Sequence, residues 1–250
     1  SLNVATVNIA QQVGYGRVLQ MAKRVGLNAD MRPTPAVALG AYELTPLEVA
    51  AAYTAFASGG TWSEPNSLQR VNSSEGDLLQ NKVLRKRRVL DPRVAYLVTN
   101  ILEDVVNRGT GAGVRSRGFR APAAGKTGTS HDGWFVGYTT NLVCAVWVGF
   151  DDNRQLGLSG ALSAGPIWAE FMKRAVLLPG YRNTQEFPIP EGIIGVTVDS
   201  ETHQLAVPEC PITEQEVFIA GTAPTDGCNL HSGSPLEMLK PMPWLKRIFR

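Results

Sequence analysis

The stretch AGKTGTS at residues 124–130 is followed at once by an aromatic, alternating run, DGWFVGY at residues 132–138. If the first stretch is a strand, successive side chains point to opposite faces. Lys126 and Gly128 then share one face, and the two threonines of the stretch share the other. Because Gly128 has no Cβ, the backbone of a ligand could approach the strand edge closely there.

A lysine flanked by hydroxyl groups suits a carboxylate ligand. Lys126 offers a point charge, and Thr127 and Thr129 offer two hydroxyl donors. The alternative is an ordinary edge strand with an exposed lysine. The stretch by itself does not separate the two interpretations, so the rest of the chain has to decide between them.

Length and charge limit the class of protein. The 250 residues are 44% hydrophobic, which is enough for one large core or for one core with a small appendage. With 24 Lys and Arg against 22 Asp and Glu, the net charge of +2 offers no electrostatic case for nucleic-acid binding. No apolar run is long enough to span a membrane. The chain starts at Ser1 without a methionine, so we expect it to be a piece of a longer protein.

Helix start signals are clearest where TPLE opens an alanine-rich run. Thr45 is a predicted N-cap, Pro46 fits the first helical position, and Glu48 completes a capping box. Further helices are predicted over residues 9–25, where two glycines interrupt the pattern, from Asp91-Pro92 to residue 106, and over residues 163–176.

Strands are predicted over residues 122–129, 133–139 and 141–149, and the tight connections between them make the neighbours antiparallel. The third strand is nearly all apolar, so we expect it to be central. Shorter strand-like runs occur at residues 67–72, 77–83, 193–198 and 216–220. The pattern predicts an α+β fold, with a main unit over residues 1–176 and an extended appendage over residues 177–250.

The three cysteines fall into two groups. Cys144 lies in an apolar run and is predicted to be a buried thiol. Cys210 and Cys228 lie in a tail rich in proline, glycine and threonine, and their spacing fits no zinc pattern because neither CxxC nor paired histidines accompany them. A disulfide between them is the preferred interpretation and would indicate an oxidising compartment. Two free thiols are the alternative.

Five segments taken in order resemble the transpeptidase domain of class A penicillin-binding proteins. They are SLNV at 1–4, TPLEVA at 45–50, Gly59-Gly60 with Pro65, RGTG at 108–111 and GKTGT at 125–129. The segment from FIAGT at 218–222 through Cys228 also resembles the C-terminal tail of that family. The resemblance implies the α+β fold of penicillin-binding proteins and serine β-lactamases, an antiparallel sheet packed with helices, here lacking its N-terminal part.

Two of the family's three sequence motifs are present. Ser-x-Asn matches Ser1 and Asn3, and Lys-Thr-Gly matches Lys126, Thr127 and Gly128. The Ser-x-x-Lys motif, which supplies the nucleophile, is absent, since no serine has a lysine three residues later. In the family this motif precedes Ser-x-Asn, so we expect the chain to begin just after the nucleophile.

The resemblance implies serine-type acyl transfer by the parent protein. A serine attacks the amide between two D-alanines of a peptidoglycan stem peptide, and an amine of a neighbouring strand resolves the acyl-enzyme. Ser1 is expected to relay a proton to the leaving amine, and Asn3 to orient the substrate amide. Lys126 would hold Ser1 and the substrate carboxylate. Thr127 and Thr129 would bind that carboxylate, and the Thr129 N–H would help to bind the oxyanion.

The resemblance also implies partners and a location. We expect stem peptides, β-lactams and the missing N-terminal part of the same protein as partners, with no nucleic acid, cofactor or metal. The parent would be periplasmic or extracytoplasmic and anchored in the cytoplasmic membrane by an upstream segment, and this chain alone would be inactive. The alternative is a non-catalytic module of the same fold that binds β-lactams or cell-wall peptides. A serine β-lactamase fits less well, because the RGTG and tail segments match penicillin-binding proteins.

Overall fold

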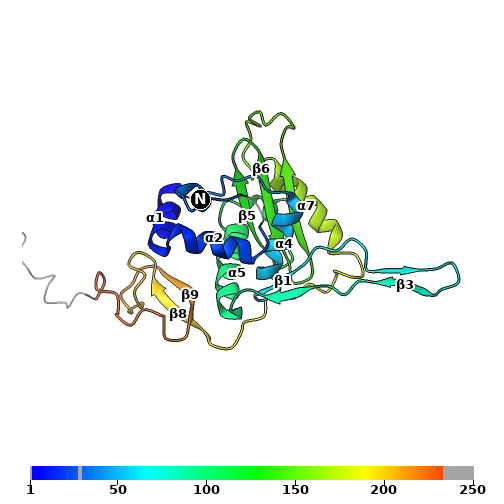
Figure 1. Cartoon of the computed structure of the whole chain (residues 1–250). Coiled ribbons are helices and arrows are strands. Elements are labelled where there is room, and N and C mark those ends of the chain that lie inside the picture. The colour runs from blue at the N-terminus through cyan, green and yellow to red at the C-terminus, as the bar shows by residue number, and fades with distance from the viewer. Residues whose placement is uncertain (1, 28–29, 233–250) are drawn as a thin grey trace, which may run out of the picture. The chain divides into compact units, whose positions relative to one another are not determined.

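The computed structural model describes residues 2–27 and 30–232, and Figure 1 labels its elements. Contacts divide the chain into two compact units, Ser1–Pro190 and Glu191–Arg250, and each is described by itself. The sequence predicts a division after residue 176, and that boundary stays a prediction. Within the described residues, no helix combines the length and the apolar character needed to cross a lipid bilayer.

The helices of the described chain all lie in the first unit. They are α1 (Asn3–Val13), α2 (Tyr15–Arg24), α3 (Pro35–Ala38), α4 (Pro46–Ala57), α5 (Pro92–Asn107), α6 (Gly113–Ser116) and α7 (Ala164–Ala175). The helical pattern over residues 9–25 thus belongs to two helices. The break falls at Gly14, whose φ of 93° is unfavourable for any residue with a side chain.

Both helix starts predicted from capping signals are confirmed. Thr45 Oγ1 accepts a hydrogen bond from the Glu48 backbone N–H at 3.2 Å, and the Glu48 carboxylate accepts one from the Thr45 N–H at 2.9 Å. At the start of α5, Asp91 Oδ1 accepts a hydrogen bond from the Arg93 N–H at 2.8 Å. These side chains satisfy backbone donors that the first helical turn leaves without partners.

Two short antiparallel pairs lie between α4 and α5. Strand β1 (Thr61–Ser63) pairs with β4 (Lys86–Arg88), and β2 (Arg70–Asn72) pairs with β3 (Leu78–Asn81) in a hairpin that reaches out from the first unit (Figure 1). The two predicted strands of the hairpin are confirmed, although each is shorter than expected. Gly60 connects α4 to β1 with a φ of 97°, and a Cβ there would collide with the Leu90 carbonyl oxygen.

The main sheet has three described strands in the order β5 (Ala124–Thr129), β6 (Gly133–Tyr138) and β7 (Val143–Val148). Both neighbouring pairs are antiparallel, as predicted, with Thr127 opposite Phe135 and Val136 opposite Ala145. One edge of β5 is therefore open within the described sheet, and this edge presents the lysine motif.

The expectation that residues 141–149 form the central strand is wrong, because β6 is central among the described strands and β7 lies at an edge. The apolar character of β7 has another cause. Cys144, Val146 and Val148 alternate along the strand and pack against the cluster that contains Trp168 of α7. Val143 points to the other face and packs in a different cluster with Tyr53 of α4. Helices cover both faces of β7, so both sets of side chains are apolar.

The core of the first unit lies between the sheet and α7. Trp168 is completely buried, with its ring 5.2 Å from that of Phe119 and 4.9 Å from that of Phe135. Its indole N–H donates to the Cys144 carbonyl oxygen at 3.1 Å, which fixes α7 on the sheet. Cys144 is a half-buried thiol rather than a fully buried one. Burial raises the pKa of the Cys144 thiol to about 11.

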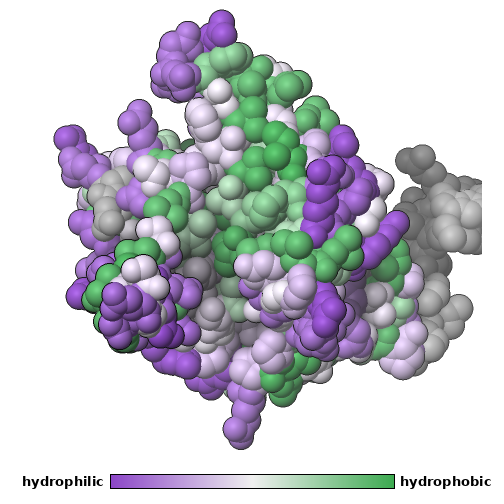
Figure 2. All heavy atoms as spheres, turned by 90° about the vertical axis from the view of Figure 1, so that its right-hand side faces the viewer, coloured by the Kyte–Doolittle hydropathy of each residue, from purple (hydrophilic) through white to green (hydrophobic). Residues whose placement is uncertain are grey.

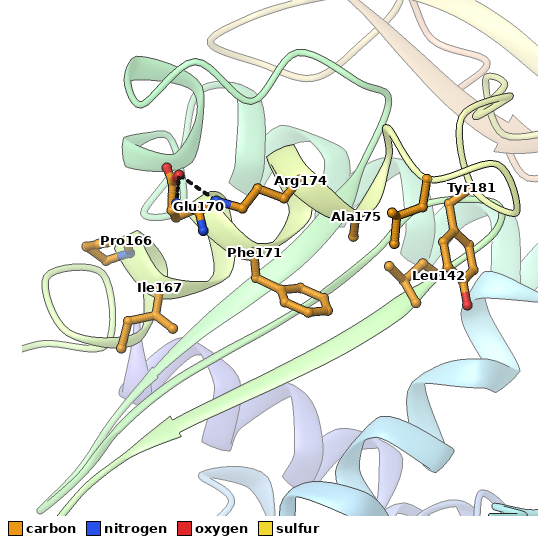
Figure 3. Close-up of a pocket in the computed structure, with 9 residues that line it drawn as sticks. Leu142, Pro166, Ile167, Glu170, Phe171, Arg174, Ala175 and Tyr181 are labelled. Carbon is orange, nitrogen blue, oxygen red and sulfur yellow. Dashed lines mark hydrogen bonds and ion pairs between the residues drawn. The ribbon is translucent and has the colours of Figure 1, made fainter.

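Hydrophobic residues form a continuous band on one face of the molecule (Figure 2). A pocket of about 780 Å³ lies along α7 and is lined by Leu142, Pro166, Ile167, Glu170, Phe171, Arg174, Ala175, Leu178 and Tyr181. Figure 3 shows Ile167 and Phe171 on one side of α7, with Leu142 and Tyr181 beyond the end of the helix, and Glu170 and Arg174 paired to each other at 3.0 Å. Phe171 is 51% exposed and Ile167 52%, so this side of the helix is apolar and uncovered in the described chain.

The second unit is built on strands β8 (Ile193–Asp199) and β9 (Thr213–Ile219), which pair antiparallel from Ile193 opposite Ile219 to Asp199 opposite Thr213. The strand-like runs predicted in this region are confirmed. Two isolated bridges join Leu205 to Val198 and to Gly227. These bridges tie the loops after β8 and β9 to the end of β8.

Candidate active site

Lys126 lies in the middle of β5, and its side chain folds onto the strand rather than extending into solvent. The ammonium donates a hydrogen bond to the Thr127 carbonyl oxygen at 2.8 Å and lies 3.4 Å from Thr127 Oγ1. Burial lowers the pKa of Lys126 below its ordinary value, because removal from water disfavours the charged form. The lysine is therefore held beside the open edge of the sheet and is easier to deprotonate than a solvated lysine.

Thr127 points to the opposite side of β5 and is 9% exposed. Its hydroxyl lies 2.8 Å from the hydroxyl of Thr110, which belongs to the RGTG loop after α5. The loop turns back so tightly that a Cβ on Gly109 would stand 2.8 Å from the Val105 Cα. The glycines of this loop thus bring the Thr110 hydroxyl to the strand that carries the lysine.

Gly128 has a reason for lacking a side chain that the sequence alone did not indicate. It lies opposite Trp134 on β6, and a Cβ would stand 3.1 Å from the Trp134 Cβ. The Trp134 indole N–H donates to Asp132 Oδ2 at 3.1 Å, and that oxygen also accepts a hydrogen bond from the Trp147 indole at 2.6 Å. One carboxylate thus holds two indole rings beside the strand.

Thr129 ends β5 and is exposed. Its Oγ1 accepts a hydrogen bond from the Gly160 N–H at 2.9 Å. A Cβ on Gly160 would collide with the carbonyl oxygens of Gly128 and Trp134, so the loop before α7 can lie this close to the sheet only with glycine. Because Gly160 uses a lone pair of the hydroxyl, Thr129 can still donate its own hydrogen to a ligand.

The remaining predicted site residues lie at the start of the chain. Ser1 lies outside the described residues. Asn3 is the first residue of α1 and is exposed, while Leu2 occupies the N-cap position. The predicted convergence of Ser1 and Asn3 with Lys126 stays a prediction.

Two residues of this region were not found from the sequence as site residues. Thr110 lies within the RGTG segment, so the family resemblance already marked its loop but gave it no role. Gly160 lies in a loop where no periodic pattern or motif distinguishes it from other glycines. The structure brings Lys126, Thr127, Thr129 and Thr110 together at one end of the sheet, where a positive charge and hydroxyl groups can bind a carboxylate.

Comparisons with known proteins agree with this geometry. Residues 1–173 match the family model described as the penicillin binding protein transpeptidase domain, and residues 189–233 match that of the penicillin-binding protein 1A C-terminal domain. Over 234 residues the chain is 36% identical to penicillin-binding protein 1A of Aquifex aeolicus, and over 247 residues it is 32% identical to penicillin-binding protein 2D of Bacillus subtilis.

A solved structure of penicillin-binding protein 1A from Haemophilus influenzae superposes with a TM-score of 0.82 at 27% identity, covering 90% of this chain and 39% of that one. The chain spans 31% of the Aquifex protein and 35% of the Bacillus protein. The match over residues 1–173 contains the strand with the lysine motif and the loop that supports it. The chain therefore belongs to the penicillin-binding protein transpeptidase family.

Proposed function

We propose that this chain is the C-terminal part of a transpeptidase domain, in a longer protein that cross-links peptidoglycan stem peptides by acyl transfer from D-Ala-D-Ala. The observation that carries the proposal is the Lys126 ammonium held on an open strand edge, with the hydroxyls of Thr127 and Thr129 on the same strand. Family membership and the short span of this chain within its relatives support the same assignment.

The reaction needs a grip on the terminal carboxylate of the stem peptide. Thr129 is exposed at the end of β5 and can donate its hydroxyl hydrogen, since its lone pair already accepts the Gly160 N–H. Lys126 supplies the positive charge, and its lowered pKa suits a group that exchanges protons with a neighbouring hydroxyl. In this proposal that hydroxyl is Ser1, and Asn3 orients the substrate amide.

The nucleophile is proposed to come from the part of the protein upstream of this chain. β-Lactams, which mimic the D-Ala-D-Ala unit, would acylate the same serine. The exposed edge of β7 and the apolar pocket along α7 are the surfaces that we propose the upstream part covers. We place the working protein outside the cytoplasm, anchored in the cytoplasmic membrane through its upstream segment.

A labelled penicillin tests the proposal on the full-length protein. The unaltered protein should form a covalent adduct that survives denaturing electrophoresis. Lys126→Ala should lower the acylation rate by a factor of about 10²–10⁴, the usual size of an acid–base contribution. Lys82→Ala, in an exposed loop of the same unit, is the matched control and should leave the rate unchanged.

Two outcomes would contradict the assignment. A full-length protein that binds penicillin reversibly, without an adduct, would support the alternative of a non-catalytic binding module. Equal acylation of the Lys126→Ala and Lys82→Ala variants would remove Lys126 from the active site. Thermal unfolding of both variants establishes that a lost signal is not the result of a lost fold.

A further inference from the structure

Four side chains of the second unit gather at one point. They come from Asp199, Cys210, Cys228 and His231, and one ligand-type atom from each lies within 4.8 Å of the other three. The Cys228 sulfur is 3.3 Å from His231 Nδ1, and the same nitrogen is 3.0 Å from Asp199 Oδ2. The set contains two thiols, one imidazole and one carboxylate.

The fold of the second unit brings these residues together. Asp199 is the last residue of β8, and Cys210 lies in the loop that leads to β9. The Cys228 N–H donates to the Leu205 carbonyl oxygen at 2.8 Å, and Leu205 is bridged to β8 at Val198. The loop after β9 is thereby fixed against the end of β8.

The Asp199 carboxylate is oriented through one oxygen, and its other oxygen lies beside His231. Oδ1 accepts hydrogen bonds from the Thr202 N–H at 2.8 Å, the Thr202 hydroxyl at 2.9 Å and the Glu201 N–H at 3.2 Å. Oδ2 is buried in a residue that is only 1% exposed, and it has no hydrogen-bond partner. His231 Nδ1 lies 3.0 Å from Oδ2, close enough for an ion pair when the imidazole is protonated. The buried carboxylate is therefore placed directly beside the imidazole of the cluster.

The two thiols are unbonded, so the disulfide predicted between Cys210 and Cys228 is wrong for this structure. The two sulfurs lie within 4.8 Å of each other and of a ligand-type atom of the imidazole and of the carboxylate. The Cys210 sulfur accepts a hydrogen bond from the Val207 N–H at 3.3 Å, a contact that orients a thiolate as a ligand. A disulfide would engage two of the four side chains and would leave the buried Asp199 carboxylate and His231 outside the bond.

We propose that Asp199, Cys210, Cys228 and His231 bind one Zn²⁺ ion in a tetrahedral site. Zinc binds thiolate sulfur at about 2.3 Å and imidazole or carboxylate atoms at about 2.0–2.2 Å, which separates tetrahedral ligand atoms by roughly 3.3–3.8 Å. The distances in the cluster bracket these values. Calcium and magnesium prefer oxygen ligands throughout, so two sulfurs argue against them.

The site serves structure rather than chemistry. Four protein ligands fill a tetrahedral zinc ion and leave no open position for a substrate. In residues 191–232 the buried hydrophobic residues are Val198 and Cys228, so the two-stranded unit has little core of its own. A unit of this size usually depends on a disulfide or a metal for stability. The signal in the sequence is the Cys228-x-x-His231 spacing, with Cys210 and Asp199 upstream.

The test uses the full-length protein, purified under reducing conditions with a tag that does not bind metal. Zinc content per chain is measured by mass spectrometry, and affinity by competition with a chromophoric chelator. The unaltered protein should bind one zinc ion per chain. The control variant Cys144→Ser, which changes a thiol outside the cluster, should bind the same amount. The variants Cys210→Ser and His231→Ala should lose the zinc. Co²⁺ in place of zinc should give the absorption of a tetrahedral site with thiolate ligands.

A second measurement covers variants that fold poorly. In the unaltered protein, removal of the metal by a chelator should expose the second unit to limited proteolysis, and added zinc should restore protection. Asp199→Asn should weaken zinc binding while Cys144→Ser does not. The proposal is overturned by a Cys210–Cys228 disulfide in the exported protein, detected as a mass lower by two hydrogens. Zinc binding unchanged in the cluster variants, or another metal at full occupancy, would also overturn it.

Discussion

Thr110 is separated from Thr127 by seventeen positions in sequence but lies 2.8 Å from it between hydroxyl oxygens. The contact positions the Thr127 hydroxyl, which also lies 3.4 Å from the Lys126 ammonium. Because Thr127 is 9% exposed, its hydroxyl has few other partners available. A change at Thr110 therefore acts on the site through Thr127, which makes Thr110 a positioning residue.

Thr110→Val should slow acylation of the full-length protein by a labelled penicillin by about 3- to 10-fold, the effect of roughly 1 kcal/mol for one hydrogen bond. The matched control is Thr213→Val at the exposed start of β9, which should leave the rate unchanged. Thr110→Ser keeps the hydroxyl and should restore most of the rate. A rate for Thr110→Val equal to that of the unaltered protein would show that the contact does not reach the site.

Glu103 carries a pH dependence outside the active site. Burial, followed by repulsion from Glu186 and Asp104, raises the pKa of Glu103 to about 7 in the folded protein. The folded state therefore binds more protons than the unfolded state from the ordinary pKa of 4.5 up to about 7. Over this range the free energy of unfolding falls as pH rises, and the loss is complete above pH 7.

Glu103→Gln should remove this dependence and raise the free energy of unfolding at pH 8 by about 1–2 kcal/mol, a figure reduced for the partial exposure of the side chain. Urea unfolding of the full-length protein at several pH values between 5 and 8 measures it. Glu75→Gln, in the exposed turn of the β2–β3 hairpin, is the control. A gain at pH 5 as large as the gain at pH 8 would contradict the argument.

At the scale of elements, the connection from α4 to β1 depends on Gly60. Its carbonyl oxygen accepts hydrogen bonds from the Val89 and Leu90 N–H groups at 2.9 and 3.1 Å, which joins α4 to the segment that follows β4. The same residue has a φ of 97° and no room for a Cβ beside the Leu90 carbonyl. A side chain at residue 60 would therefore be unfavourable for two reasons, the positive φ of the backbone and the collision with the Leu90 carbonyl oxygen.

Gly60→Ala should destabilise the first unit by at least about 2 kcal/mol. Gly76→Ala is a close control, because Gly76 has a φ of 94° but open space around its Cβ position, so that variant should lose only about 1 kcal/mol. The difference between the two thermal midpoints isolates the collision. Equal midpoints would mean that the Leu90 segment moves aside at no cost.

Local signals were enough to predict many of these elements. The capping groups at Thr45 and Asp91 lie within three residues of the donors they satisfy, so sequence shows them directly. The position of β7 could not be predicted in this way. A strand covered by α4 on one face and α7 on the other has the same apolar pattern as a strand with neighbours on both edges. Coverage of a face depends on tertiary packing, which periodicity does not record.

The candidate site shows the same limit. The lysine motif is contiguous, so the resemblance gave Lys126, Thr127 and Thr129. Thr110 and Gly160 lie 17 and 31 positions from the threonines that they contact, so no local pattern pairs them. The cluster around Asp199 is assembled from loops of the second unit, and its ligands are far apart in sequence. A search limited to CxxC and paired histidines passes over it.

At the scale of the whole molecule, the described sheet offers an open edge at β7 beside an apolar pocket. An unpaired edge next to exposed Phe171 and Ile167 favours association with other chains. If the upstream part of the protein covers this surface, the chain by itself should be prone to self-association.

This chain alone should form no covalent adduct with a labelled penicillin, because no serine in it has a lysine three residues later. Intact-mass measurement after incubation decides the question, and circular dichroism establishes that the sample is folded. The full-length protein serves as the positive control. A stoichiometric adduct on any serine of the chain would show that the nucleophile lies within it.

Trp134 and Trp147 share the carboxylate of Asp132 and lie opposite each other on β6 and β7. Two indoles fixed at close range couple their electronic transitions, so the sheet carries its own chromophore pair. A near-ultraviolet circular dichroism signal from this pair would follow the integrity of the sheet without an added label. Because Trp134 lies opposite Gly128 of β5, its emission would also respond when an inhibitor binds along β5.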